Sequence, residues 1–170
     1  VSFEYLPKPV TKLNLFKALS RGQSLTHLTK KQNIELDEDE TPKRFKAIKV
    51  LLVEDNKVNQ TIAKAMFKSF GILVDVAENG LEALDKVSSN RYQIIFMDIQ
   101  MPKMDGVTAT KKIRKQYDKV ELPIIALTAN VTKEEIDAYL ESGMNSHLSK
   151  PYDKNAIERV LNSLNEKASN

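Results

Sequence analysis

From about residue 47 to residue 168, short apolar runs alternate with longer stretches in which apolar residues recur three and four positions apart. Five runs have the length and β-branched character of strands: residues 49–53, 72–77, 92–97, 123–128 and 145–149. The stretches between them predict helices, as in the stripe formed by Val58, Ile62, Ala65 and Met66. This alternation predicts βαβ units, whose right-handed crossovers build a parallel sheet with helices on both faces.

The five runs differ in apolar content. Runs 49–53, 92–97 and 123–128 are almost continuously apolar, which is typical of strands buried on both faces of a parallel sheet. The fifth run holds His147 and one large aliphatic residue, Leu148, so we expect it at an edge. The pattern therefore predicts a three-layered α/β domain at residues 47–168.

The first 46 residues follow a different pattern. Between residues 21 and 46 the apolar content falls, and an acidic run followed by a basic cluster predicts a linker. Residues 5–19, YLPKPVTKLNLFKAL, are similar to residues 147–161, HLSKPYDKNAIERVL. Five residues of the first stretch recur in the second: Leu6, Lys8, Pro9, Lys12 and Leu19 match Leu148, Lys150, Pro151, Lys154 and Leu161.

Composition narrows the class of protein. Of the 170 residues, 41% are hydrophobic and 29% charged, which suits a globular domain with one core. A net charge of +3, without a basic stripe interleaved with aromatic residues, argues against nucleic-acid binding. The absence of cysteine argues against a zinc site, and short apolar runs without a signal peptide predict no direct membrane contact. Because the first residue is Val1 rather than Met, we expect a piece of a longer protein.

Polar residues gather where the predicted strands end. Glu54 and Asp55 follow the first strand, Asp98 the third, Thr128 the fourth and Lys150 the fifth. In doubly wound sheets these carboxyl ends meet at one edge, which carries the functional site. Any one of the carboxylates alone could cap a helix, but three together repel one another unless a cation lies between them. Because carboxylate oxygens suit Mg²⁺, the pattern predicts a magnesium site, with Mn²⁺ as an alternative ion.

Four motifs follow one another at these strand ends: VEDN (53–56), FMDIQMPKMDG (96–106), ALTAN (126–130) and SKP (149–151). In that order they resemble the receiver domain of two-component response regulators. The resemblance implies a flavodoxin-like, doubly wound sheet of five parallel strands in the order 2-1-3-4-5. It also implies that Asp98 is the phosphoacceptor.

The resemblance assigns the other site residues by position. Four groups would surround the magnesium: the side chains of Glu54, Asp55 and Asp98 and the backbone carbonyl of Gln100. Thr128 and Lys150 would hold the phosphoryl group. These roles agree with the chemistry, because a carboxylate is a competent nucleophile and the rest of phosphoryl transfer is positioning and charge stabilisation. Such a domain catalyses its own aspartyl phosphorylation and dephosphorylation.

The resemblance also implies a conformational switch through Thr128 and the fifth strand. When the Thr128 hydroxyl bonds a phosphoryl oxygen, a ring on the fifth strand turns inward; receivers usually have Tyr or Phe there, and this chain has His147. His147 is therefore either the switch residue or an edge-strand histidine without that role. The amides of Gln100 and Asn130 flank the site and would affect the lifetime of the phosphoaspartate.

Three further residues are interpreted as structural. Pro102 fixes the backbone after Asp98, and Gly106 lets it turn into the next helix. Pro151 restricts the backbone after Lys150. In this family the Lys-Pro bond is often cis, and the alternative is an ordinary turn proline.

The opening stretch is best explained as the last strand and helix of a preceding receiver-like domain at residues 1–20, joined by a linker at residues 21–46; the alternative is chance similarity. Tandem receiver-like domains resemble the C-terminal end of hybrid sensor histidine kinases. That resemblance implies a histidine kinase domain in the same polypeptide, a histidine phosphotransfer protein as partner, and a cytoplasmic location as part of a membrane-anchored sensor kinase. The helix at residues 11–20 would dock on the receiver or on a second copy, which would give a homodimer.

Two other classes of function fit parts of the pattern. A pseudo-receiver would dock partners without phosphorylation, but the complete set of strand-end residues argues against it. An aspartyl-phosphate hydrolase of the haloacid dehalogenase type needs a second acid two residues after the nucleophile, where this chain has Gln100. The sequence therefore favours a phosphorelay receiver, and a phosphotransfer helix bundle would dock around Asp98 and the first helix, near Asn56, Val58 and Asn59.

Overall fold

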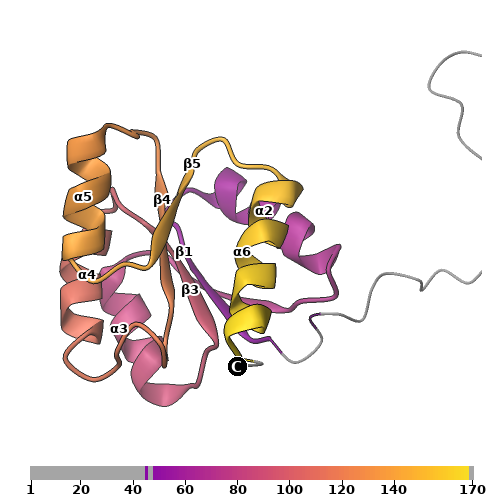
Figure 1. Ribbon diagram of the computed structural model, residues 1–170, viewed down its shortest axis with the longest axis horizontal. Coiled ribbons are helices and arrows are strands. Elements are labelled where there is room, and N and C mark those ends of the chain that lie inside the picture. The colour runs from indigo at the N-terminus through magenta and orange to yellow at the C-terminus, as the bar shows by residue number, and fades with distance from the viewer. Residues whose placement is uncertain (1–44, 46–47, 169–170) are drawn as a thin grey trace, which may run out of the picture. The chain divides into compact units, whose positions relative to one another are not determined.

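A five-stranded parallel sheet lies at the centre of the protein in the computed structural model, which describes residue 45 and residues 48–168, with side chains as far as residue 164 (Figure 1). The strands are β1 (Val50–Val53), β2 (Val74–Ala77), β3 (Ile94–Asp98), β4 (Ile124–Thr128) and β5 (Ser146–Ser149). Their order is β2-β1-β3-β4-β5, and each neighbouring pair is parallel. Each strand matches its predicted run to within a few residues, and the predicted order is confirmed.

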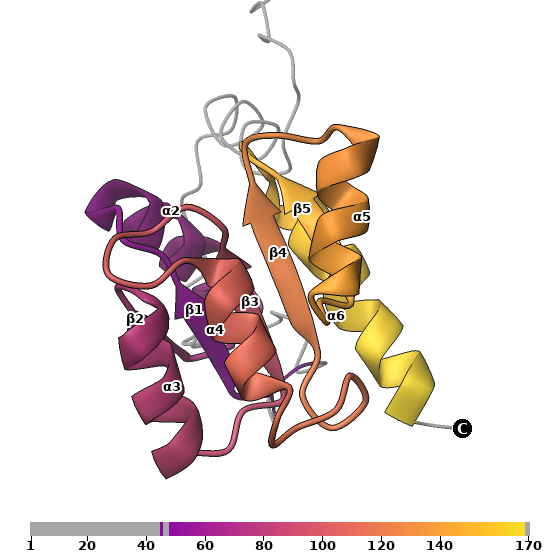
Figure 2. The same cartoon turned by 90° about the vertical axis from the view of Figure 1, so that its left-hand side faces the viewer.

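Five described helices cover both faces of the sheet, as Figures 1 and 2 show. They are α2 (Lys57–Lys68), α3 (Gly80–Ser89), α4 (Gly106–Ile113), α5 (Lys133–Glu141) and α6 (Lys154–Ala168). Helices α2 and α6 lie on one face, and α3, α4 and α5 lie on the other. The predicted doubly wound α/β fold is confirmed. None of the helices in this part of the chain is both long and apolar enough to cross a membrane.

The two faces of the sheet carry separate hydrophobic cores. Along β1, Leu51 and Val53 pack with residues of α3, α4 and α5, whereas Val50 and Leu52 pack with residues of α2 and α6. Every residue of β1, β3 and β4 is buried, as expected for strands covered on both sides. Strand β5 has exposed ends and half-buried central residues, so its predicted place at the edge is confirmed.

Helix α2 presents most of its predicted apolar stripe to solvent, and of the four residues only Met66 packs against the core. Val58 is 66% exposed and Ile62 50% exposed, while the face toward the sheet is formed by Gln60, Ala63 and Phe67. Regular apolar spacing usually marks the buried face of a helix. Here it predicts the helix correctly, but the stripe lies on the surface next to the carboxyl edge of the sheet.

The core begins before β1. Phe45 is buried at 1% exposure, and its ring meets that of Phe70 edge to face at a centroid distance of 5.9 Å. The sequence analysis placed this residue in the linker, two residues before the receiver domain. The remaining predictions for residues 1–44, including the receiver-like tail and its docking, lie outside the described residues.

Candidate functional site

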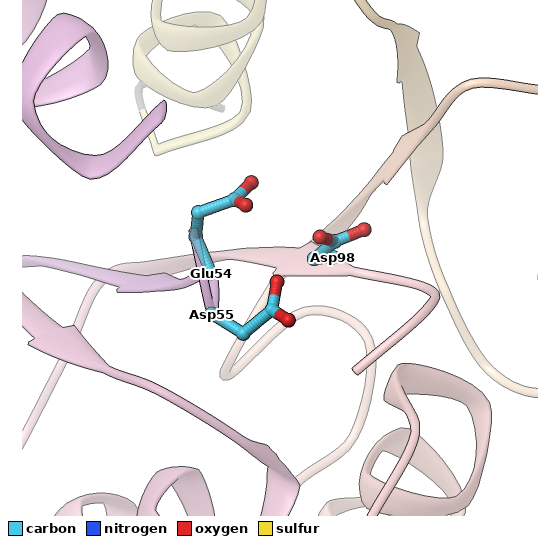
Figure 3. A group of neighbouring side chains, drawn as sticks. All are labelled: Glu54, Asp55 and Asp98. Carbon is cyan, nitrogen blue, oxygen red and sulfur yellow. The ribbon is translucent and has the colours of Figure 1, made fainter. Parts of the chain in front are cut away.

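Three carboxylates converge at the carboxyl edge of the sheet, between the ends of β1 and β3 (Figure 3). Val53 and Met97 are partners in the strand register, so the residues that follow them, Glu54 and Asp98, lie side by side. Each of Glu54, Asp55 and Asp98 offers an oxygen within 4.8 Å of the others. Glu54 and Asp98 are buried and Asp55 is exposed. Such a half-open set of carboxylate oxygens fits a divalent cation that keeps several of its waters.

Lys150 supplies the positive charge in this group. Its Nζ donates to Glu54 Oε2 at 2.7 Å and to Asp98 Oδ2 at 2.8 Å. Burial alone would lower the pKa of Lys150, but the hydrogen bonds to the two acids outweigh it and raise that pKa. The backbone N–H of Lys150 donates to the carbonyl of Thr128 at 2.7 Å, and the Lys150–Pro151 peptide bond is cis.

The environment of Asp98 differs from that of an ordinary surface aspartate. Its burial raises the pKa of the carboxyl group, the nearby Glu54 acts in the same direction, and the bond from Lys150 offsets part of the increase. Tyr152 lies near the same acids, and burial together with the charges of Glu54 and Asp98 raises the pKa of its hydroxyl to about 12. The site therefore holds an excess of negative charge that an added cation would relieve.

Polar groups from the first turn of α2 hold Glu54. Its Oε1 accepts from Asn59 Nδ2 at 3.0 Å and from the backbone N–H of Asn56 at 3.2 Å, while Lys150 occupies its other oxygen. Its backbone carbonyl accepts from Gln60 Nε2 at 2.7 Å. The sequence analysis assigned no role to Gln60, although its place in the helix that directly follows β1 is a signal for such a contact.

Thr128 lies on the opposite side of Asp98, at the end of β4. Its side chain lines a cleft of about 120 Å³ together with Asp98, Gln100, Asn130 and Lys150. A cleft of this size has space for a few water molecules, each of which takes about 30 Å³ in the liquid. The structure thus brings the predicted nucleophile, hydroxyl and ammonium to one small space.

His147 lies on β5, where it pairs in register with Ala126, two residues before Thr128. Its side chain is half-buried. The sequence analysis missed a residue that contacts Thr128: the hydroxyl oxygen of Tyr139, on α5, lies 3.3 Å from Thr128 Oγ1. Only the packing of α5 against the end of β4 brings these two hydroxyls together.

The loop after Asp98 keeps close to the site. Gln100 lines the small cleft and also a second, wider one of about 540 Å³, which it shares with Asp55, Pro102 and Asp105. The carbonyl of Pro102 accepts from Met104 N–H at 2.7 Å. A Cβ on Gly106 would lie 2.1 Å from the carbonyl oxygen of Asp98. Close approach of two backbone segments, rather than a positive φ, therefore requires glycine here.

Asn130 is bound to helix α5. Its side-chain amide donates to Glu135 Oε1 at 3.2 Å, and its backbone N–H donates to Thr128 Oγ1 at 3.1 Å. Asn130 also lines the small cleft. The residue that we expected to affect the phosphoaspartate thus connects the cleft to α5.

Comparison with known proteins agrees with this geometry. Residues 50–162 match the family model of the response regulator receiver domain. The chain is 41% identical to the osmosensing histidine protein kinase SLN1 of Saccharomyces cerevisiae over 145 residues, which cover 82% of the chain and 12% of that kinase. It is 38% identical to the aerobic respiration control sensor protein ArcB of Escherichia coli over 126 residues, covering 74% of the chain and 16% of the sensor. The chain thus spans a small part of the length of these relatives.

A solved structure is similar in fold. The receiver domain of the sensor histidine kinase PA1611 from Pseudomonas aeruginosa, crystallised with a magnesium ion coordinated in its active site cleft, is 40% identical. The match has a TM-score of 0.64 and covers 69% of this chain and 96% of that one.

Proposed function

Because the chain belongs to the response regulator receiver domain family of two-component phosphorelay systems, we propose that it accepts a phosphoryl group from a phosphohistidine onto Asp98 and passes it to a histidine phosphotransfer protein. The observation that carries this proposal is the cleft in which Asp98 meets Thr128 and Lys150, beside the carboxylates of Glu54 and Asp55. A phosphorylation-independent docking module would not need this combination of charges.

The proposed reaction begins with Asp98 as the nucleophile. A carboxylate oxygen of Asp98 forms a bond to phosphorus while the bond from phosphorus to the histidine nitrogen breaks, and the imidazole keeps the electron pair. The Lys150 ammonium, which bonds Asp98 at 2.8 Å, follows the charge onto the phosphoryl oxygens. Thr128 bonds another of these oxygens. Transfer to the next histidine is the reverse of this step.

Glu54, Asp55, Asp98 and the carbonyl of Gln100 would hold Mg²⁺ or Mn²⁺. Asp55 is exposed and its carboxylate is the freest to bind a cation directly, whereas both oxygens of Glu54 already accept hydrogen bonds. When bound, the ion would supply positive charge for the phosphoryl oxygens. Lys150 and the amide of Asn59 keep Glu54 in place beside the ion site.

The partner would dock on the exposed stripe of α2. Val58 and Ile62 lie one turn apart and are 66% and 50% exposed, and Val58 stands in the first turn of α2, two residues after the helix cap Asn56. A helix of a phosphotransfer protein placed on this stripe could bring its histidine to the edge where Asp98 lies. We assign the histidine kinase domain to the same longer polypeptide, because SLN1 is a histidine protein kinase of which this chain covers only 12%. A cytosolic location for this part remains the expectation from the family resemblance. Residues 1–20 and 21–46 would be the end of a preceding receiver-like domain and a linker.

Intact mass after incubation with acetyl phosphate and Mg²⁺ tests the chemistry. The native chain should gain one phosphoryl group, chelation of the metal should prevent the gain, and Asp98→Asn should show none. Asp105→Asn is the matched control, because Asp105 caps α4 and lines only the wider cleft, and asparagine caps a helix equally well. Absence of labelling in the native chain, while another receiver is labelled in parallel, would favour the docking module.

Transfer from a phosphorylated phosphotransfer protein tests the docking stripe. Ile62→Glu should slow this transfer by about tenfold or more, because a charge is buried at the interface, while labelling by acetyl phosphate stays unchanged. The control is Leu73→Glu, at a residue that is 86% exposed in the loop before β2, at the opposite end of the sheet. Equal transfer rates for the two variants would place the docking surface elsewhere.

A further inference from the structure

The hydroxyl of Thr128 is fully occupied in this structure. A threonine hydroxyl has one hydrogen to donate and two lone pairs to accept with. Thr128 Oγ1 donates to the carbonyl of Asn130 at 2.8 Å and accepts from the N–H of Asn130 at 3.1 Å. Its second lone pair remains for Tyr139, 3.3 Å away. Because the hydrogen of Thr128 is already used, the Tyr139 hydroxyl is the donor in this contact.

Tyr139 is placed to hold Thr128 and has little freedom of its own. The residue is 8% exposed, and its ring belongs to the core between the sheet and helices α3, α4 and α5. Among the described residues, Thr128 is the only hydrogen-bond partner of the Tyr139 hydroxyl. A buried hydroxyl that loses its partner is destabilised, so the positions of Thr128 and Tyr139 are coupled.

We propose that Tyr139 is a positioning residue that keeps the Thr128 hydroxyl engaged at the wall of the cleft until Asp98 is phosphorylated, so that helix α5 receives the change at the site. This proposal rests on the proposed function. For Thr128 to donate to a phosphoryl oxygen, its hydroxyl must release the carbonyl of Asn130 and reorient, which disrupts its contact with Tyr139. The Tyr139 hydroxyl then needs a new acceptor, which α5 provides by shifting.

A second set of hydrogen bonds, to Glu135, would transmit the reorientation of Thr128 to the first turn of α5. The Asn130 amide donates to Glu135 Oε1 at 3.2 Å, and Thr132 Oγ1 donates to Glu135 Oε2 at 2.9 Å. The loop that moves with Thr128 is therefore joined to α5 at its first turn, through Glu135, and in its second half, through Tyr139. Neither connection includes His147, which lies on β5 at the level of Ala126.

Tyr139→Phe tests the proposal with one atom removed. Phenylalanine keeps the ring in the core and frees Thr128, so the initial rate of labelling by acetyl phosphate should increase by about twofold to tenfold, the equivalent of one net hydrogen bond. Tyr117→Phe is the matched control, since Tyr117 is half-buried in the same core and should leave the rate unchanged. In a Thr128→Ala background, Tyr139→Phe should have no effect, because the bond that it removes is already absent.

These results separate the two proposals. If the native chain is not labelled, the proposed function fails; if it is labelled and Tyr139→Phe leaves the rate unchanged or lowers it, the role of Tyr139 is refuted. An equal rate increase in the Thr128→Ala background would also refute it, because Tyr139 would then act independently of Thr128.

A measurement on the native chain needs no variant. Beryllofluoride with Mg²⁺ mimics the phosphoryl group, so its addition should shift the nuclear magnetic resonance signals of the Tyr139 ring and of the α5 amides, and leave the Tyr117 ring unchanged. Shifts confined to residues around Asp98 and to β5, with none in Tyr139, would overturn the proposal.

Discussion

At the ends of β1 and β3 the site is held by charges, whereas at the end of β4 it is held by neutral hydroxyl and amide groups. On the first side, the acidic side, Lys150 bonds both Glu54 and Asp98 at less than 3 Å. On the second, the hydroxyl side, Thr128 bonds the backbone of Asn130 and the hydroxyl of Tyr139. Both sides lie at the same edge of one sheet, within reach of Asp98.

This difference separates two tasks. Charged groups in a partly buried site interact strongly, so removing one of them changes both the stability of the fold and the binding of a cation. Neutral hydrogen bonds are individually weak, and an equilibrium that depends on them can be shifted by a single new contact. The acidic side is thus suited to the reaction, and the hydroxyl side to the conformational response.

The largest effect on stability is expected from Lys150→Met, which removes the only cation that bonds the buried pair within the described site. Glu54, at 1% exposure, then has no positively charged partner, and the free energy of unfolding at neutral pH should fall by about 2 kcal/mol or more. Urea denaturation measures the loss. Added Mg²⁺ should restore part of it by binding the same carboxylates.

The control for this variant is Lys64→Met, on the exposed face of α2. Its unfolding free energy should change by less than about 0.5 kcal/mol, with no response to Mg²⁺ beyond that of the native chain. If the two variants lose equal stability, the ion pairs of Lys150 with Glu54 and Asp98 do not stabilise the acidic side, and the contrast between the two sides is wrong.

Asp98→Asn should act in the opposite direction. Burial raises the pKa of Asp98 in the folded chain above its ordinary value of 3.8, so the folded state binds this proton more tightly than the unfolded state. Stability is therefore lost as the pH rises from 3.8 through the folded pKa, and the ionised carboxylate costs stability at neutral pH. In the absence of metal, Asp98→Asn should be more stable than the native chain at pH 7, on the order of 1 kcal/mol.

Urea denaturation in a chelating buffer at several pH values checks this sign. The advantage of Asp98→Asn should disappear toward acid pH, where the native Asp98 is protonated. Asp105→Asn should change stability with the opposite sign. Burial would raise the pKa of Asp105, but hydrogen bonds from Thr108 outweigh it and lower that pKa, so the ionised form of Asp105 stabilises the fold. An Asp98→Asn variant that is less stable than the native chain at pH 7 would show that Asp98 contributes a net stabilising ion pair.

Most of the fold could be predicted from the sequence, because the strands and their polar ends follow a simple period. The five strands and the gathering of Glu54, Asp55, Asp98, Thr128 and Lys150 all appear in the structure. The strand order, also confirmed, was implied by the family resemblance and not by the period. The buried side of α2 could not be predicted. The apolar spacing of Val58 and Ile62 marks a helix, but the residues buried against the sheet are Ala63 and Phe67.

The parts of the site that escaped prediction depend on contacts between distant elements. Lys150 was expected to bind the phosphoryl group, but its bond to Glu54, 96 residues away, joins the ends of two strands that are not neighbours in the sheet, and no local pattern encodes it. Tyr139 looks like any core residue of an amphipathic helix. Its hydroxyl matters because α5 packs over the end of β4, which no local pattern encodes.

The smallest effect is expected on the hydroxyl side, from Thr132→Ala. Thr132 caps α5: its Oγ1 accepts from the N–H of Glu135 at 3.3 Å and donates to the carboxylate of the same residue at 2.9 Å. Loss of this cap should lower the free energy of unfolding by about 0.5 to 1 kcal/mol and speed amide exchange in the first turn of α5, whereas Thr132→Ser should keep the native values. Affinity for Mg²⁺, followed by titration, should be the same in both variants, because no charge near Asp98 changes. A drop in Mg²⁺ affinity for Thr132→Ala alone would mean that the hydroxyl side also positions the carboxylates, and that the two tasks are not separate.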